Sequence, residues 1–360
     1  MKKSLLALAV LGAYAGVASA QSSVTLYGTV DLSAKYVKND GSERRYSLSQ
    51  DGINSSQLGL KGTEDLGGGL KAGFVLLAGI NADTGSANTQ FWNRRATVSL
   101  WGNFGEVRLG RDYTPTFWNN TIFDAFGTNG LGDSSHVQQL GVGTFVRANN
   151  SIGYFLPSGI GGVYGQVMAA ASEGASGPTL NGTANVGANP GRYVGGRVGW
   201  AGGPIDVAAA YANQRLDAVA GAPSQKTYNI GASYDLGVVK LMGYFDRDTL
   251  SFTGADLKEN RGSFSVVVPI GQSEIHAGYE LSKLKNGVTG LSTKIDQFAL
   301  GYVYNLSKRT ALYATASRLN NKDGTHNSVA GGTAQTAAPT GPAGGSFKST
   351  GFEAGLRHFF

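Results

Sequence analysis

The sequence predicts an all-β protein, a transmembrane antiparallel β-barrel of 16 strands. Three observations support this fold class. Apolar residues alternate with polar or small ones, with a period of two, along nearly all of the chain after residue 20. Short and long connections take turns between the alternating runs. Beyond the N-terminal segment, no window holds the roughly 18 consecutive apolar residues that a membrane-spanning helix requires.

The composition excludes several other classes of protein. The 360 residues include 55 glycines, 9 prolines and no cysteine, and 15% of them are charged. Charge is thus well below the usual share of about 25%, and glycine is about twice as frequent as usual. The absence of a Gly-X-Y period excludes collagen, and 16 tyrosines, 16 phenylalanines and 4 tryptophans are too many for a disordered chain. Without cysteine, disulfide scaffolds and thiolate chemistry are excluded.

Residues 1–20 have the features of a secretory signal peptide. Two lysines follow the first residue, an apolar stretch runs from Leu5 to Val17, and Ala18-Ser19-Ala20 is a small-residue cleavage site. The apolar stretch is too short for a transmembrane helix. We therefore expect residues 21–360 to form one exported barrel domain, although the length alone would suggest two or three soluble domains. Removing the two lysines from the 30 basic residues leaves 28 against 24 acidic ones, too small an excess for a nucleic-acid-binding surface.

The first run after the signal peptide shows the alternation clearly. One face carries Val24, Leu26 and Val30, and the other carries Thr25, Tyr27, Thr29 and Asp31. Comparable runs recur over residues 57–61, 95–100, 193–200, 228–234, 239–246, 274–281 and 297–304. Strands of about 10 residues have the length to cross a bilayer.

Fifteen connections join the sixteen expected strands, eight of them long and seven short. The short ones carry turn-forming residues, as hairpins do, and include residues 64–69, 101–105, 201–203, 235–237, 269–271 and 305–309. The long ones are more polar and lie near residues 37–50, 81–90, 113–145, 171–190, 217–226, 249–260, 284–293 and 321–346.

Alternation by itself also occurs in a soluble β-sandwich. The membrane is favoured because short and long connections fit periplasmic turns and external loops. Aromatic residues also lie toward strand ends, namely Tyr27, Trp101, Tyr154, Trp200, Tyr234 and Tyr304. Closure leaves no unpaired backbone in lipid, and a barrel of this size encloses an aqueous lumen. Because the inward face is polar and glycine-rich, we expect no hydrophobic core inside.

Five strings spread over the chain are distinctive. They are Ser23-Val24-Thr25-Leu26-Tyr27-Gly28; residues 58–67, which read LGLKGTEDLG; Asn93-Arg94-Arg95-Ala96 followed by residues 102–105 and 109–111; Arg147-Ala148-Asn149-Asn150-Ser151-Ile152; and Gly355-Leu356-Arg357-His358-Phe359-Phe360. Together they resemble the Gram-negative general porins, in particular the anion-preferring branch of trimeric 16-stranded porins.

This resemblance implies a homotrimer in the bacterial outer membrane, in contact with outer-membrane lipid and lipopolysaccharide. It implies a channel for passive diffusion of ions and small hydrophilic solutes, without a cofactor. It further implies that the terminal Phe360 is read by the barrel-assembly machinery of the outer membrane. The alternative interpretation of Phe360 is an aromatic residue of the interfacial girdle.

The third long connection, residues 113–145, is the expected pore constriction. A loop of about 33 residues is usually functional, and the resemblance implies that this loop folds into the lumen and narrows it. Its acids are Asp124 and Asp133, and its aromatics Phe117, Trp118, Phe123 and Phe126 could pack it on the wall.

Basic residues on the lumen face are expected opposite this loop. Alternation directs Arg95, Arg108, Arg147 and Arg197 inward, since their apolar neighbours face outward. The resemblance assigns the wall arginines to Arg94 and Arg147. Alternation places Arg94 on the outer face unless a bulge intervenes, so both Arg94 and Arg95 remain candidates.

The polar face of the second strand completes the candidate set with Gln57 and Lys61. Many members of the family carry arginine where this chain has Gln57. A ring of fixed arginines in a low-dielectric wall lowers the barrier for anions and raises it for cations. The missing arginine predicts a weaker anion preference.

Enzymatic function finds no support in the sequence. The four histidines show no metal-ligand spacing, and neither a G-x-S-x-G elbow nor a P-loop is present. Asp133, Ser134, Ser135 and His136 are neighbours in sequence, which rarely form a triad. A barrel adhesin and an outer-membrane hydrolase are more distant alternatives. A substrate-specific channel is the nearer one, and it would align aromatics such as Tyr27, Tyr193 and Tyr244 along the lumen.

Overall fold

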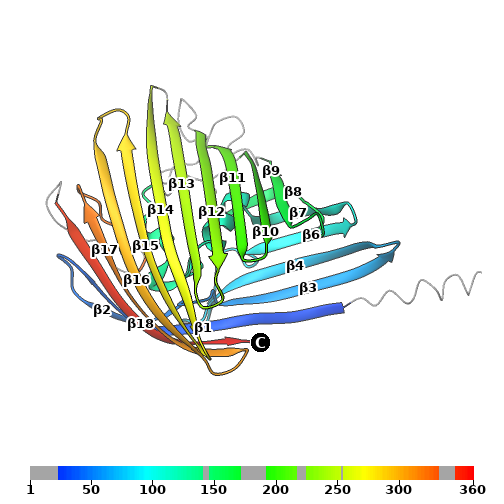
Figure 1. Ribbon diagram of the computed structural model, residues 1–360, viewed down its shortest axis with the longest axis horizontal. Coiled ribbons are helices and arrows are strands. Elements are labelled where there is room, and N and C mark those ends of the chain that lie inside the picture. Colours follow the sequence, from blue (N-terminus) through cyan, green and yellow to red (C-terminus); the bar gives the residue numbers. More distant parts are fainter. Residues whose placement is uncertain (1–22, 141–145, 172–191, 217–223, 253, 332–344) are drawn as a thin grey trace, which may run out of the picture.

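The computed structural model describes residues 23–140, 146–171, 192–216, 224–252, 254–331 and 345–360. They form an antiparallel barrel in which strands that follow one another in the chain lie side by side (Figure 1). The predicted signal peptide over residues 1–20 lies outside the described residues. Within the described ranges, no helix is long and apolar enough to cross a membrane.

The strands of the first half are β1 (Ser23–Asn39), β2 (Arg45–Gln50), β3 (Gln57–Gly67), β4 (Leu70–Asn81), β5 (Ser86–Ala87), β6 (Arg95–Gly102), β7 (Gly105–Tyr113), β8 (Arg147–Phe155) and β9 (Val163–Ala170). Those of the second half are β10 (Tyr193–Gly202), β11 (Ile205–Arg215), β12 (Ser224–Asp235), β13 (Lys240–Phe252), β14 (Ala255–Ile270), β15 (Ser273–Asn286), β16 (Ser292–Asn305), β17 (Thr310–Lys322) and β18 (Phe347–Phe359). Between β7 and β8 lie the helix α2 (Pro115–Ile122) and the 3-10 turns η1 (Gly130–Gly132) and η2 (Ser134–Val137).

Sixteen strands make up the wall, as the sequence predicts. β2 and β3 both pair with β1, over its residues 32–37 and 23–29 respectively, so they are two halves of one interrupted strand. β5 is a two-residue strand at the end of β4. The other strand segments each cross the wall once.

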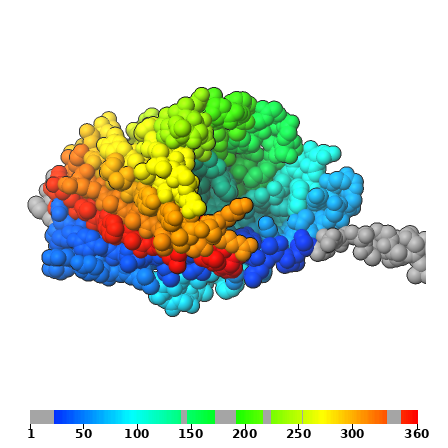
Figure 2. All heavy atoms as spheres, turned by 60° about the horizontal axis from the view of Figure 1, so that its bottom comes forward, coloured from blue at the N-terminus to red at the C-terminus, as the bar shows by residue number. Residues whose placement is uncertain are grey.

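The barrel closes between the two ends of the chain. β1 pairs antiparallel with β18, from Thr29 opposite Phe359 to Asn39 opposite Ser349, and Figure 1 shows the blue and red strands side by side. The space-filling view shows the molecule hollowed between the orange and the cyan strands (Figure 2).

The two faces of the wall follow the predicted alternation. On β1, Val24 and Leu26 point outward and are 68% and 60% exposed, whereas Asp31 and Ser33 point inward and are buried. An apolar outer face is what lipid requires, because lipid offers no partner to polar groups.

Several strands end further out than the sequence predicts. β1 and β2 are joined by residues 40–44, and β13 and β14 by residues 253–254, so the long connections predicted at 37–50 and 249–260 are wrong. The connections near 217–226 and 284–293 are also shorter, since β12 begins at Ser224 and β16 at Ser292. Backbone pairing continues here while outward residues such as Arg247 and Lys258 are already polar. Polarity beyond the apolar band therefore does not mark the end of a strand.

The expectation of an interior without apolar packing is wrong. One buried cluster inside the barrel joins residues of the wall to residues of two connections, and consists of Val37, Leu131, Val137, Ile295, Leu319 and Val329. It forms because the chain between β7 and β8 folds inward and covers part of the wall.

Candidate pore constriction

The third-loop segment, residues 114–140, lies inside the barrel. Its helix α2 begins at Thr114, whose hydroxyl accepts a hydrogen bond from the Phe117 amide at 3.3 Å, with Pro115 in the first turn. The Asn119 side chain donates to the Ala208 carbonyl at 3.2 Å and to Asn229 Oδ1 at 2.9 Å. These bonds fix α2 against the inner face of β11 and β12.

Glycines on the inner face of the wall receive the bulky side chains of the third-loop segment. A Cβ at Gly231 would overlap the ring of Phe123, and one at Gly301 would lie 3.0 Å from the ring of Phe126. A Cβ at Gly351 would lie 2.9 Å from Leu131. We call Gly231, Gly278, Gly301 and Gly351 the glycine seats. They account for part of the glycine excess, which therefore does more than keep the lumen open.

Buried wall carboxylates hold the backbone of the same segment. Glu353 accepts a hydrogen bond from the Leu131 amide at 2.8 Å, and Glu259 accepts from the amides of Gln139 and Leu140 at 2.9 and 2.7 Å. Bonds from amides to an ionised carboxylate are among the stronger hydrogen bonds. The third-loop segment is thus held against the wall at its middle and at its far end.

A second segment also turns into the lumen, between β2 and β3. This inward turn, residues 51–56, is held by Asp31, whose carboxylate accepts from the amides of Gly52, Ile53 and Asn54 at 3.3, 3.0 and 2.7 Å. The Ser55 hydroxyl donates to Asn129 Oδ1 at 2.9 Å, so the inward turn touches the third-loop segment. This turn was not predicted from the sequence, although its Asp51-Gly52 pair is a turn signal.

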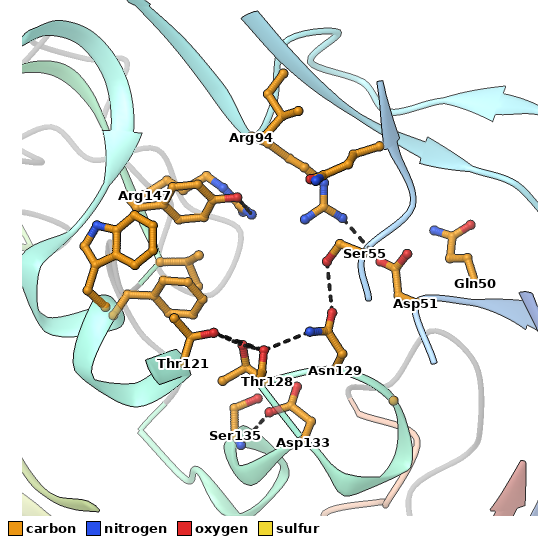
Figure 3. Close-up of a pocket in the computed structure, with 18 of the residues that line it drawn as sticks. Gln50, Asp51, Ser55, Arg94, Thr121, Thr128, Asn129, Asp133, Ser135 and Arg147 are labelled. Atoms are coloured by element: carbon orange, nitrogen blue, oxygen red, sulfur yellow. Dashed lines mark hydrogen bonds and ion pairs between the residues drawn. The ribbon is translucent and has the colours of Figure 1, made fainter. Parts of the chain in front are cut away.

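These two segments and the wall enclose a cavity of about 790 Å³, the constriction cavity (Figure 3). Its cationic lining residues are Lys35, Arg94, Arg95 and Arg147, and its acidic ones are Asp51 and Asp133. Tyr27, Gln57, Tyr113, Phe117 and Trp118 line it as well. In Figure 3, Arg94 and Arg147 point toward the same open space.

Both candidate arginines at the start of β6 line the constriction cavity. Arg94 lies 3.3 Å from Asp51 Oδ2, and Arg95 lies 2.7 Å from Asp112 Oδ1. The outward direction that alternation gives Arg94 is wrong, because β6 begins only at Arg95. The guanidinium of Arg147 lies 4.6 Å from the ring centroid of Tyr113 and donates to its hydroxyl at 3.2 Å.

Three other predicted basic residues face inward but do not line the constriction cavity. Arg108 forms ion pairs with Glu106 at 2.9 Å and with Asp112 at 2.6 Å. Arg197 donates to Asn119 Oδ1 and stacks 4.6 Å from the Tyr164 ring. Lys61 lies 5.5 Å from the ring centroid of Tyr27. Gln57, by contrast, is a lining residue.

The two predicted acids of the third-loop segment differ in position. Asp133 lines the constriction cavity, and its Oδ1 accepts from the Ser135 amide at 2.7 Å at the start of η2. Asp124 is only 5% exposed and is absent from the lining. Its carboxylate accepts from the amides of Phe126 and Thr128 at 2.9 and 3.2 Å, so it shapes the loop instead of facing the arginines. Burial raises the pKa of Asp124 to about 6.

Of the two acids that line the constriction cavity, Asp51 is the one paired with an arginine, and it was not among the residues predicted from the sequence. Burial raises its pKa, while the Ser56 amide and Arg94 act in the opposite direction.

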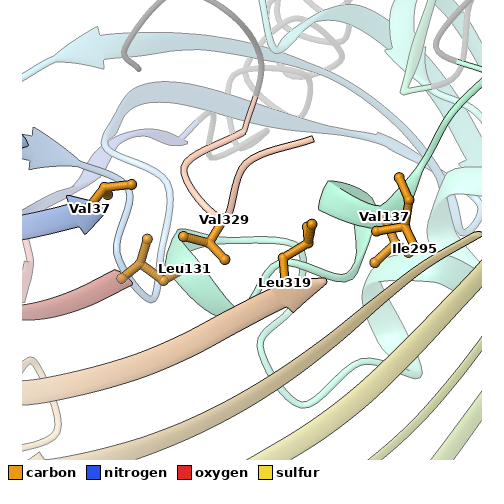
Figure 4. Close-up of a cluster of buried hydrophobic side chains, with 6 residues drawn as sticks. All are labelled: Val37, Leu131, Val137, Ile295, Leu319 and Val329. Atoms are coloured by element: carbon orange, nitrogen blue, oxygen red, sulfur yellow. The ribbon is translucent and has the colours of Figure 1, made fainter. Parts of the chain in front are cut away.

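On the side of the third-loop segment away from the constriction cavity, Leu131 and Val137 pack into the interior cluster (Figure 4). One face of the third-loop segment therefore lines the aqueous cavity, and the opposite face packs against apolar side chains.

A family model described as Gram-negative porin matches residues 7–324. The chain belongs to the Gram-negative porin family. This porin is 41% identical over 372 aligned residues to outer membrane porin protein 32 of Delftia acidovorans, with 100% of both chains covered. It is 31% identical to an outer membrane porin protein of Bordetella pertussis, over 89% of this chain and 95% of that protein.

A solved structure, the anion-selective porin from Comamonas acidovorans, is similar to this porin with a TM-score of 0.81 and 38% identity, covering 94% of this chain and 100% of that one. The trimer form of OmpT from Vibrio cholerae, with a TM-score of 0.67 and 13% identity, covering 94% of this chain and 99% of that one, shares the fold. The predicted family and location are thus confirmed. This porin is a passive diffusion channel of the bacterial outer membrane and not an enzyme.

Proposed function

We propose that this porin passes ions and small hydrophilic solutes with a weak preference for anions, set at the constriction cavity. The observation that carries the proposal is the lining itself, four cationic side chains against two carboxylates. Fixed charges in a narrow aqueous passage through a low-dielectric wall set the energy barrier for permeating ions.

The preference is weak because most of these cations are partly neutralised. Arg94 is paired with Asp51, Arg95 with Asp112, and Lys35 with Glu353 at 3.4 Å. In the described part of the chain, Arg147 contacts no carboxylate, so it is the residue on which the preference depends most. The neutral Gln57 occupies a lining position where many members of the family have an arginine.

The test is the reversal potential of the purified porin in a planar bilayer under a KCl gradient. Arg147→Gln and Arg95→Gln together are expected to abolish the anion preference, whereas Gln57→Arg is expected to strengthen it. The matched control is Lys308→Gln with Arg309→Gln, two exposed basic residues in the short connection between β16 and β17. An unchanged reversal potential in both constriction variants would contradict the proposal.

The same proposal includes the partners of the channel. We propose a homotrimer, in line with the trimer form of the Vibrio cholerae structure, surrounded by outer-membrane lipid and lipopolysaccharide. We also propose that the barrel-assembly machinery recognises the C-terminal strand through Phe360. A substrate-specific channel is disfavoured because Tyr193 and Tyr244 are only 2% and 6% exposed and thus line no passage beside Tyr27.

A further inference from the structure

Basic residues form a row on the outer face of the barrel, near the end of the barrel at which the long connections lie. The strand register places Lys283 of β15 directly opposite Lys294 of β16, and Lys294 directly opposite Lys322 of β17. On the other side, Lys283 is opposite Asn260 of β14, which is opposite Arg247 of β13. One register row across five adjacent strands therefore carries four cations.

These side chains point away from the lumen. Lys283 and Lys294 are exposed and flanked along their strands by the buried, inward-facing residues Ser282 and Ile295. Adjacent strands are about 4.8 Å apart, so the three lysines span about 10 Å. Like charges directly opposite one another in a sheet are destabilising. The row therefore costs stability unless an anion lies over it.

The protein's own carboxylates neutralise only part of this positive charge. Lys322 is paired with Asp296 at 2.8 Å, and Lys258, one step nearer the loops, is paired with Asp256 at 3.3 Å. Within the described residues, Lys283, Lys294 and Arg247 have no carboxylate partner. Three cations are thus uncompensated on one small surface.

The position of the row along the strands, relative to the apolar outer band, can also be stated. On β15, the outward residues Tyr279 and Leu281 are 48% and 43% exposed and apolar, and Lys283 is the next outward residue. On β13, Arg247 follows the exposed Phe245 in the same way. On β13, β15 and β16 the cations thus begin where the apolar band ends, whereas on β17 the outward Arg318 lies lower, in register with Phe298. At the opposite end of β12–β17, the described outward residues of these strands include no lysine or arginine.

We propose that Arg247, Lys283 and Lys294 form a binding surface for the phosphate groups of lipopolysaccharide in the outer leaflet. Basic clusters just outside the hydrocarbon region bind anionic headgroups. Arg247, Lys283 and Lys294 span three strand spacings, or about 14 Å. A headgroup with more than one phosphate matches several cations at this spacing better than a singly charged lipid does. This inference rests on the proposed contact with lipopolysaccharide, and it names the residues that make it.

The test uses the full-length folded porin with Lys283→Gln and Lys294→Gln, and purified lipopolysaccharide as the probe. Affinity is measured by titration in detergent, and at least about a tenfold loss is expected. The control variant Lys308→Gln with Arg309→Gln loses the same charge at the other end of the barrel and should bind as the unaltered porin does. Lipopolysaccharide stripped of its phosphates should bind the unaltered porin as weakly as the intact form binds the double variant.

Heat unfolding separates binding from folding. Without lipopolysaccharide the double variant should be at least as stable as the unaltered porin, because repulsion between lysines is removed. With lipopolysaccharide the unaltered porin should gain more stability than the variant. Equal affinities for lipopolysaccharide, or equally strong binding of phosphatidylglycerol vesicles, would overturn the proposal. The reversal potential should not change, so failure here is distinct from failure of the constriction assignment.

Discussion

Phe360, the last residue of the chain, takes the place of a side chain at Gly28. The amide of each residue donates to the carbonyl of the other at 3.1 Å, and a Cβ at position 28 would overlap the Phe360 ring. The first and last strands of the barrel therefore meet in a pair that only glycine at position 28 allows.

Gly28→Ala is expected to destabilise closure by about 1–3 kcal/mol, as overpacking usually does. Gly262→Ala is the matched control, because a Cβ there meets nothing within 4 Å. Heat-dependent gel mobility of the folded barrel measures the loss. In Phe360→Ala the ring is gone, so adding Gly28→Ala should cost less than it does in the unaltered porin; the part that remains comes from the Gln57 carbonyl oxygen, 2.6 Å from the same Cβ position. If the two effects simply add, the ring does not occupy this site.

Asp51→Asn is expected to raise the ratio of anion to cation permeability, on the order of twofold, because it removes the carboxylate 3.3 Å from Arg94. The carboxamide keeps the shape of the side chain. Reversal potentials in a KCl gradient measure the change. Glu64→Gln, an exposed acid at the far end of β3, serves as the control. Equal ratios in the two variants would argue against a role for Asp51 in selectivity.

Gly231→Val is expected to expel Phe123 from its seat and to loosen α2, since the seat leaves no room for a side chain. The pore should conduct more current and fluctuate more. Single-channel recordings measure both quantities. Gly243→Val is the control, because a Cβ there meets only a carbonyl oxygen at 3.9 Å. Adding Phe123→Ala to Gly231→Val should not increase the fluctuations further, and a large additional increase would speak against the seat.

The turn over residues 124–128 is expected to be held more firmly in acid than at neutral pH. The pKa of Asp124 is raised from an ordinary value of 3.8 to about 6 by burial. Folding therefore favours the protonated carboxyl. This contribution is fully present below about pH 4 and is lost as the pH rises through about 6. Open-channel noise should increase between pH 4 and pH 7, and Asp124→Asn should remove this increase. The same pH profile in both proteins would rule out Asp124 as its source.

The fold could be predicted from the sequence because the two-residue period is a local signal: apolar residues indicate the lipid face of a strand, and polar or small residues indicate the lumen face. Val24 and Leu26 identify the lipid side whatever the rest of the chain does. Strand ends were less predictable, because β13 and β14 continue into water, where both faces are polar and hydrogen bonding alone maintains the sheet.

The constriction depends on contacts between distant segments, which no local pattern contains. Alternation misdirected Arg94 because it lies just before a regular strand. Asp124 and Asp51 are both acids in connections, yet one is buried by folding and the other is brought beside an arginine 43 positions away. The glycine seats were equally hidden, since an inward glycine in an open lumen and one beneath Phe123 look alike in sequence.

The seats of Phe126 and Leu131 belong to β15, β16 and β18, the last quarter of the chain. A barrel still lacking these strands has nowhere to dock the tip of the segment between β7 and β8. Narrowing of the passage must then follow, and not precede, completion of the wall. A barrel without its last strands would leave a wide, unselective opening, so the pore reaches its final diameter only when the whole barrel has folded.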